Sequence, residues 1–195
     1  MHIVSVLGSP RQDGNSNLMT RWVMDRATGL GATASQYALN EMDFQGCQAC
    51  WKCKGVHEGC VLEDDLSPVL DETARADALI MSTPVFYGDV TAQLKAFIDR
   101  TFSYLVPKYY RQEQNKSRLA PGKKLLMVIA QGYPDPGRFD DIFGRYAEFF
   151  QWMGFTHTRQ FRACGVYFLG DANKRREALE NEAEEAARWL VGEGE

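Results

Sequence analysis

The sequence predicts an α/β fold, a three-layer sandwich with helices on both faces of a five-stranded parallel sheet. Apolar, strand-like runs alternate with helical patterns along the chain, which is typical of parallel strands joined by right-handed crossovers. The first run, residues 2–7, leads through a short polar loop directly into a helical pattern. The length, 195 residues, suits one domain, so we predict a single domain over 1–195 with a cysteine-rich insert at about 44–63.

Five runs predict the strands, at residues 2–7, 33–39, 78–83, 124–130 and 161–168. The first is rich in β-branched residues, and the third is stopped by Pro84. The second is shorter and more polar, which places it near an edge of the sheet. The fourth is almost wholly apolar, so we expect it to be covered on both faces.

Helical patterns separate these strands, at residues 15–28, 66–74, after Asp89, at 139–153 and at 171–191. Asp89 is the predicted cap of the third helix, whose apolar residues share one face. Aromatic residues give the helix at 139–153 a wide apolar face. Because that face exceeds what one side of a sheet needs, we expect a homodimer or a tetramer.

The flavodoxin-like strand order 2-1-3-4-5 fits this number of strands. In that topology a ligand binds in the crevice beyond the carboxyl ends of the first and third strands. We therefore expect the loop at residues 9–17 to lie beside the loop at 84–89, with residues 131–137 close by.

Composition excludes several classes of partner. The formal net charge of −4 gives no electrostatic support to binding nucleic acid or an anionic membrane. Apolar runs of the length of a membrane span are absent from the sequence. We expect no export signal, because the first strand begins at residue 2, and hence a cytoplasmic location.

The loop after the first strand combines glycines, serines, asparagines and Arg11 just before a helix, where free N–H groups and the helix dipole favour a phosphate. Five residues separate Gly8 from Gly14, and Asn15 stands where a P-loop has lysine, so nucleotide triphosphate hydrolysis is disfavoured. The dinucleotide glycine fingerprint is also absent. Hydroxyls, amides and one guanidinium suit a phosphate monoester; an ordinary capped turn is the alternative.

The loop after the third strand offers flat apolar surface. Pro84 fixes the backbone, Gly88 permits close approach, and Phe86 and Tyr87 supply aromatic rings. A planar heteroaromatic ring suits this loop, although an ordinary strand-to-helix turn with inward aromatics has the same composition. A phosphate loop and a ring-sized loop at one crevice together point to FMN.

Two motifs resemble the flavodoxin-fold NAD(P)H-dependent FMN reductases: Gly-Ser-Pro-Arg-x-x-Gly-Asn-Ser from Gly8, and residues 83–100. The resemblance spans most of residues 1–135. It implies phosphate contacts at Ser9, Arg11, Asn15, Ser16 and Asn17, and ring contacts at Pro84, Val85, Phe86, Tyr87 and Gly88. Lys95, Asp99 and Arg100 also match family positions, and we expect Asp99 or Arg100 to pair with a neighbouring helix or subunit.

Four of the five cysteines lie within 14 positions, in the pattern Cys47-x₂-Cys50-x₂-Cys53-x₆-Cys60. Such crowding indicates a metal or redox role. Two-residue gaps let one turn of chain wrap a cubane, which predicts a 4Fe–4S cluster. The pattern also resembles the iron–sulfur flavoprotein branch of the same family. A zinc site and a metal-free loop are the alternatives.

These features predict an FMN-dependent oxidoreductase that takes hydride from NAD(P)H and passes electrons to a flavin, a quinone or a protein acceptor. A 4Fe–4S cluster would add one-electron transfer. The flavin carries the chemistry, so no side chain is expected to act as acid or base. The alternative is a flavodoxin-like or iron–sulfur electron carrier without substrate turnover of its own.

Overall fold

The computed structural model describes residues 1–55 and 57–192. Five parallel strands form one sheet in the order β2-β1-β3-β4-β5, which confirms the predicted flavodoxin-like α/β fold. The strands are β1 (His2–Leu7), β2 (Thr33–Ala38), β3 (Ala78–Pro84), β4 (Lys124–Gln131) and β5 (His157–Cys164). The helices are α1 (Asn15–Gly29), α2 (Leu66–Arg75), α3 (Ala92–Arg100), α4 (Asp141–Trp152), α5 (Asp171–Lys174) and α6 (Arg176–Val191).

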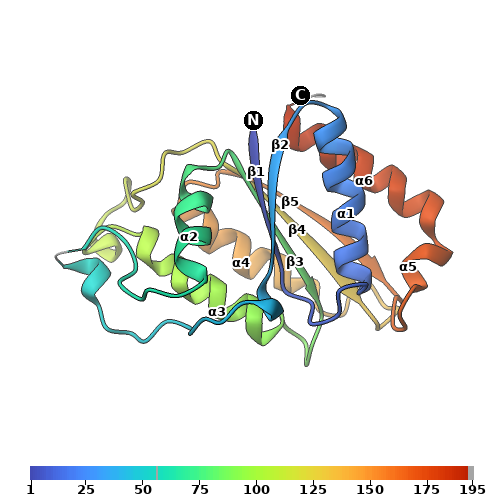
Figure 1. Ribbon diagram of the computed structural model, residues 1–195, viewed down its shortest axis with the longest axis horizontal. Helices are drawn as coiled ribbons and strands as arrows, with labels where there is room; N and C mark the ends of the chain where they lie inside the picture. The colour runs from blue at the N-terminus through green and yellow to red at the C-terminus, as the bar shows by residue number, and fades with distance from the viewer. Residues whose placement is uncertain (56, 193–195) are drawn as a thin grey trace.

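Helices cover the sheet on both faces (Figure 1). α1 and α6 pack on one face and α2, α3 and α4 on the other, each layer with its own buried core. Successive strand residues supply the two cores in turn: Val4 and Val6 face α3, whereas Ile3 faces α1. This alternation explains why the central strands read as continuous apolar runs.

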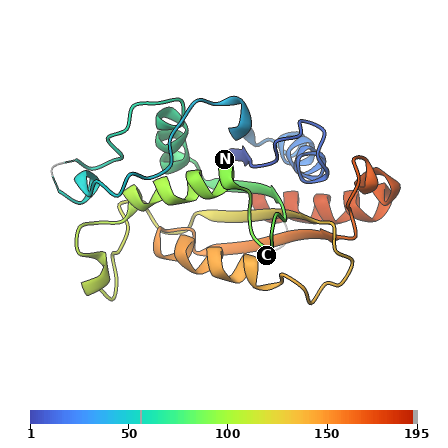
Figure 2. The same ribbon diagram turned by 90° about the horizontal axis from the view of Figure 1, so that it is seen from below.

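The ends of β1, β3 and β4 lie level, because Leu7 pairs with Ser82 and Pro84 pairs with Ala130. Figure 2, seen from below, looks onto this edge of the sheet and the loops that follow the strands. The register therefore brings the loops after β1, β3, β4 and β5 to one side of the molecule.

The fifth strand begins and ends four residues earlier than predicted. Gly165, with φ +75°, turns the chain after Cys164, and the Val166 N–H donates to the Gln131 carbonyl across the end of β4. The polar residues from His157 to Gln160 belong to the strand because β5 is an edge strand. An edge strand is less completely buried than a central one, so polar side chains on β5 can remain in contact with water.

Two helix boundaries also differ from expectation. Thr91, not Asp89, caps α3, and its side chain accepts a hydrogen bond from Leu94 N–H. The carboxylate of Asp89 instead binds Val90 N–H and the Tyr146 hydroxyl. The predicted last helix is divided into α5 and α6 at Arg175, whose backbone leaves the helical region.

The apolar face of α4 packs mostly within the chain. Ile142, Tyr146 and Phe150 are buried under the sheet, whereas Phe149 is half exposed. Among the described residues, no helix is both long and apolar enough to cross a membrane.

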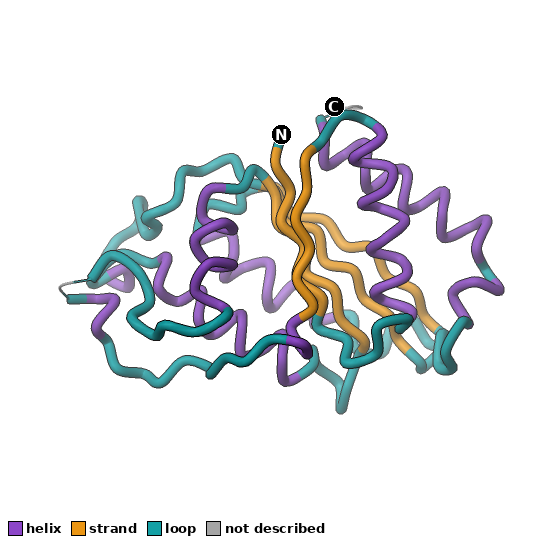
Figure 3. The backbone as a smooth tube through the Cα atoms, viewed as in Figure 1, coloured by secondary structure: helices purple, strands orange, loops and turns teal. Residues whose placement is uncertain are grey.

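The segment between β2 and α2 contains four cysteines and extends away from the sheet as a long loop (Figure 3). Its regular structure within the described part is one 3₁₀ turn at Leu39–Glu41 and another at Lys52–Lys54.

Candidate functional site

A cavity of about 550 Å³ opens beyond the carboxyl ends of the strands. Loops from four strands line it. Its wall consists of Ser9, Pro10, Arg11, Gly14, Asn15, Pro84, Val85, Phe86, Tyr87, Ala130, Gly132, Tyr133, Pro134, Val166 and Tyr167. The two loops expected to meet do lie side by side here, and seven of the ten residues assigned to the cofactor are in the wall.

Close backbone packing holds the first two loops together. The Gly8 N–H donates to the Ser82 carbonyl at 2.7 Å, and the Thr91 hydroxyl donates to the Gly8 carbonyl at 2.7 Å. The Thr91 N–H donates in turn to the Thr83 hydroxyl at 3.1 Å. These bonds fix the loop after β1 against the start of α3.

The N-terminus of α1 faces this cavity without a side-chain cap. Gly14 is its N-cap, and the first backbone N–H groups, at Asn15, Ser16 and Asn17, have no carbonyl one turn earlier to bind. These groups and the helix dipole suit an anion. Gly14 is itself packed tightly, since a Cβ there would lie 2.5 Å from Ser9 Oγ.

The side chain of Asn15 serves the fold. It donates to the carbonyls of Val166 (3.2 Å) and Phe168 (2.9 Å) and accepts from Ala172 N–H (3.1 Å). Asn15 therefore ties the loop after β5 to the first helix, and its backbone N–H is the part that remains for a ligand.

Ser16 and Asn17 are buried behind the wall, and Gly88 also lies outside it. The hydroxyl of Ser16 has no hydrogen-bond partner in the described part of the chain, and Asn17 Nδ2 donates to the Arg11 carbonyl at 3.0 Å. Arg11 is exposed, and its N–H donates to Ser9 Oγ at 3.2 Å. An unpaired hydroxyl, uncapped N–H groups and an arginine fit a phosphate monoester.

The loop after β3 forms a tight turn. Phe86 and Asp89 exchange two backbone hydrogen bonds of 2.9 and 3.0 Å across Tyr87 and Gly88, both at positive φ. The Tyr87 side chain is fully exposed, and Phe86 is half exposed. A flat apolar ring therefore finds uncovered aromatic surface here.

Asp89 braces this turn against α4. Its carboxylate accepts from Val90 N–H (2.7 Å), the Tyr146 hydroxyl (2.8 Å) and Arg145 (3.1 Å). Burial alone would raise the pKa of Asp89, but these hydrogen bonds hold it below its usual value. The ionised carboxylate thus anchors the turn.

Two wall residues after β5, Val166 and Tyr167, are not among the residues that the sequence predicts for the cofactor. The sequence signal there is the apolar run 166–169, most of which falls within the strand predicted at 161–168. The loop after β4 was expected near the crevice, and Gln131 shapes it by donating to the carbonyls of Tyr133 (2.7 Å) and Asp135 (2.8 Å).

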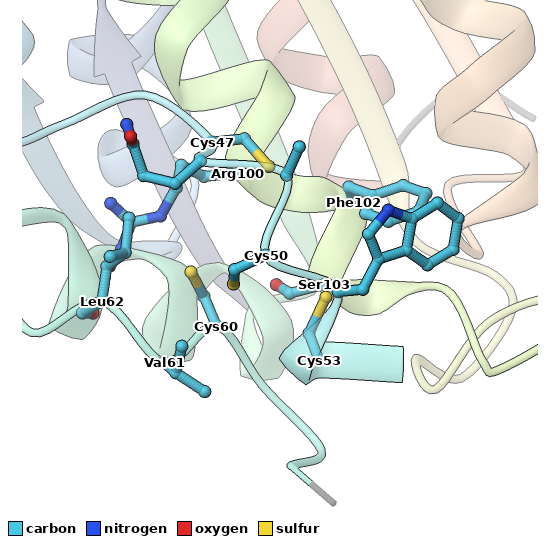
Figure 4. A pocket seen from close by; sticks show the side chains of 12 residues that line it. Cys47, Cys50, Cys53, Cys60, Val61, Leu62, Arg100, Phe102 and Ser103 are labelled. Atoms are coloured by element: carbon cyan, nitrogen blue, oxygen red, sulfur yellow. Dashed lines mark hydrogen bonds between the residues drawn. The ribbon is translucent and has the colours of Figure 1, made fainter. Parts of the chain in front are cut away.

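The four clustered cysteines line a second cavity, of about 240 Å³, and all are free thiols. Figure 4 shows the side chains of Cys47, Cys50, Cys53 and Cys60 around this cavity, with Arg100 and Phe102 in the same wall. Within the described ranges, no three His, Cys, Asp or Glu side chains are grouped so as to hold one metal ion. Four cysteine side chains are the donor set that an iron–sulfur cluster takes, and all four line this one cavity.

Arg100 pairs with Asp64, at 2.7 Å, in the segment just before α2, whereas Asp99 pairs with Lys95 one turn earlier on α3. The side chain of Arg100 is completely buried. It also donates to the carbonyls of Gln45 (2.8 Å) and Leu62 (3.3 Å), which flank the cysteine segment. Burial alone would lower the pKa of Arg100, but Asp64 and the nearby Cys60 raise it on balance. Because its partners lie on both sides of the cysteine segment, Arg100 holds the two ends of that segment together. Removing one partner of a buried ion pair costs about 3–5 kcal/mol of stability.

Two more cations connect the cysteine segment to the rest of the fold, Lys54 from within the segment and Arg118 from outside it. Lys54 donates to the Leu105 carbonyl at 2.6 Å and lies 4.0 Å from the centre of the Phe102 ring. Arg118 donates to the Cys53 carbonyl at 2.9 Å. Positive charge beside these cysteines would suit an anionic group held by their sulfurs.

α3 lies between the two cavities. Thr91, its cap, is bonded to the loop after β1, and Arg100, its last residue, lines the cysteine cavity. Nine helical residues span about 13 Å. Among the described residues, none lines both cavities.

An iron-sulfur flavoprotein of Methanocaldococcus jannaschii is 33% identical over 102 residues, 52% of this chain and 52% of the relative. One from Archaeoglobus fulgidus is 34% identical over 104 residues, 53% of this chain and 47% of the relative. The chain thus spans about half the length of the curated relatives it matches.

Two solved structures share the fold over nearly the whole chain. An FMN-dependent NADH-azoreductase from Bacillus anthracis in complex with FMN has a TM-score of 0.70 at 18% identity, covering 97% of this chain and 99% of that one. An NAD(P)H:quinone oxidoreductase from Methanothermobacter marburgensis has a TM-score of 0.70 at 21% identity, covering 98% and 97%. At these identities the likeness concerns the fold.

A family model described as NADPH-dependent FMN reductase matches residues 1–137. The match includes the loop before α1, the cysteine segment and the loop between β3 and α3. Because it covers more than two thirds of the 195 residues, the chain belongs to the NADPH-dependent FMN reductase family.

Proposed function

We propose that the chain is an FMN-dependent oxidoreductase that takes hydride from NAD(P)H and passes electrons to a flavin, a quinone or a protein acceptor. The observation that carries this proposal is the cavity of about 550 Å³ where the uncapped start of α1 meets the aromatic turn after β3. Family membership and the fold shared with an FMN-complexed azoreductase support it.

The first loop holds the phosphate in this proposal. The backbone N–H groups of Asn15, Ser16 and Asn17 donate to it, together with the unpaired hydroxyl of Ser16. The Ser9 hydroxyl would join them by exchanging its bond to the Arg11 carbonyl for one to the phosphate. Arg11, which has no hydrogen bond from its guanidinium in the described ranges, supplies the positive charge.

The second loop receives the ring. Pro84, Val85, Phe86, Tyr87 and Gly88 orient it and shield one face from water. FMN, when bound, supplies hydride acceptance and transfer of one or two electrons. The protein's own residues bind and orient, and none is assigned as acid or base.

The cysteine cavity is the second redox site of the proposal. Cys47, Cys50, Cys53 and Cys60 would hold a 4Fe–4S cluster, which supplies one-electron transfer when bound. The iron-sulfur flavoproteins among the relatives, and the four free thiols around one cavity, support this assignment. Free thiols also favour a reducing compartment, the cytoplasm.

A homodimer or tetramer completes the proposal. Exposed aromatic side chains at Tyr87, Tyr167 and Phe168 surround the mouth of the cofactor cavity or lie next to it, and a second copy would cover them. Sedimentation at micromolar concentration tests this, and a monomer there contradicts it.

The decisive experiment is purification without oxygen, followed by an absorption spectrum, iron and sulfide assays, and steady-state NADH and NADPH oxidation. We expect bound flavin, four irons per chain and turnover with a quinone or free flavin. A colourless protein that ignores added FMN contradicts the proposal. Bound FMN without nicotinamide oxidation assigns the chain instead as an electron carrier.

A further inference from the structure

One N–H of the buried Arg100 side chain has no acceptor. Its two terminal nitrogens are used: one donates to Gln45 O and Asp64 Oδ2 (2.8 and 2.7 Å), the other to Leu62 O and Asp64 Oδ1 (3.3 and 3.2 Å). Nε is buried and unpaired within the described part of the chain. A buried N–H donor without an acceptor lowers the stability of the fold. Buried polar groups are nearly always paired, so the atoms around Nε indicate which acceptor completes its hydrogen bond.

The surroundings of Arg100 are sulfur-rich. Arg100 is 0% exposed on its side chain and lines the cavity formed by the four cysteines. In Figure 4 its guanidinium lies on the side of the cavity that Cys60 occupies. Gln48 and Ser103 are the other polar side chains of the wall, and neither accepts from Nε.

Resting on the cluster of the proposed function, we propose that Arg100 Nε–H donates a hydrogen bond to sulfur at this site, either the Cys60 thiolate or a sulfide of the cluster. Arg100 then touches the cofactor and is more than a structural clamp. The two terminal nitrogens bind Asp64 and the carbonyls of Gln45 and Leu62, on either side of the cysteine segment. Nε remains free to donate to the sulfur.

A direction for the redox effect follows. Hydrogen bonds to the sulfurs are among the determinants of cluster potential. An N–H donor stabilises the reduced, more negative cluster more than the oxidised one, so it raises the reduction potential. Lysine keeps the charge but lacks a donor at the Nε position and cannot form the same bidentate pair with Asp64.

The first experiment uses the unaltered chain. Protein grown with ¹⁵N-arginine is purified without oxygen and reduced with dithionite, and pulsed EPR is recorded on the cluster signal. We expect a ¹⁵N hyperfine coupling that unlabelled protein lacks. A cluster signal without arginine coupling overturns the Arg100 assignment alone, whereas protein without iron overturns the cluster and this inference together.

The second experiment identifies the arginine. In labelled R100K the ¹⁵N coupling is expected to disappear and the reduction potential to become more negative, while labelled R159K keeps both. Arg159 is a matched control because it pairs with Glu185 at the surface, on β5. Persistence of the coupling in R100K overturns the assignment. If R100K does not fold, the measurement on the unaltered chain still decides whether an arginine donates to the cluster.

Discussion

At Gly8 the backbone passes so close to its neighbours that a methyl group has no room. A Cβ there would lie 2.8 Å from Leu94 Cβ and 2.9 Å from the Ser82 carbonyl oxygen. We expect Gly8→Ala to lower the free energy of unfolding by about 1–3 kcal/mol, as overpacking does, and to weaken FMN binding. Denaturant unfolding and flavin titration measure both effects.

Gly29→Ala is the matched control, because a Cβ there meets nothing within 4 Å. Since alanine is the better helix former, this variant is expected to be as stable as the parent or more so. Equal stability of the two variants would contradict the steric argument.

The position of a residue in its own loop could be predicted, but its partners far along the chain could not. Ser9 and Arg11 were placed at the crevice because their loop directly follows β1, and both line the cavity. The Asn15 side chain instead binds the chain near residues 166–172, a partner more than 150 residues away. Local composition carries no record of such a partner, and the roles of these residues toward a cofactor remain predictions.

Elements were predicted better in type than in extent. Alternation of apolar runs and helical faces predicted all five strands and their helices, because burial of each element decides its pattern. The observed boundaries of β5 and α3 differ from the predicted ones because hydrogen bonds between distant parts of the chain set them. Val166 N–H pairs with Gln131, and Asp89 pairs with Tyr146 in place of capping the helix.

The cap of α3 also ties two loops together. Removing its hydroxyl in Thr91→Val loses the bonds to Leu94 N–H and to the Gly8 carbonyl. We expect the free energy of unfolding to fall by about 1–2 kcal/mol and FMN affinity to fall with it. Thr91→Ser keeps the hydroxyl and is the control, both in thermal unfolding and in flavin titration. If Thr91→Ser lost as much stability and FMN affinity as Thr91→Val, the role assigned to the hydroxyl would be refuted.

α2 is held to the sheet by a carboxylate that titrates in acid. The Glu72 pKa is lowered from 4.5 to about 2 by hydrogen bonds from Ser35, Tyr37 and His2. Its contribution is therefore complete above pH 4.5 and is lost as the pH falls toward 2.

We expect Glu72→Gln to reduce the difference in unfolding free energy between pH 7 and pH 3 by about 1–2 kcal/mol, after allowance for solvent screening. Glu113→Gln, at an exposed position, is the control. Urea titrations at the two pH values measure the difference, and an unchanged difference in Glu72→Gln would show that this carboxylate does not couple folding to pH.

On the scale of the molecule, the two cavities lie at opposite ends of α3. Replacing Cys47, Cys50, Cys53 and Cys60 together by serine is expected to abolish iron binding and leave the FMN dissociation constant within about twofold. Arg11→Ala is the reciprocal variant: it keeps iron and weakens FMN about 10- to 100-fold, the effect of losing one charged hydrogen bond. Loss of both cofactors in either variant would contradict the separation.

The sheet order and the position of the crevice could be predicted, because parallel strands allow few connections. The anchoring of the cysteine segment could not, since it depends on Arg100 reaching Asp64, Gln45 and Leu62 across the fold. The spacing of Cys47, Cys50, Cys53 and Cys60 predicts that they act together. It does not predict which side chains bind the backbone on either side of them.

The bonds from Asn15 to Val166, Phe168 and Ala172 have a consequence for biosynthesis. The first helix leaves the ribosome before these partners are made, so the Asn15 side chain cannot form its three bonds until residue 172 has left the exit tunnel. We therefore expect the wall that Val166 and Tyr167 contribute, and with it a complete cofactor site, only after α5 has been translated.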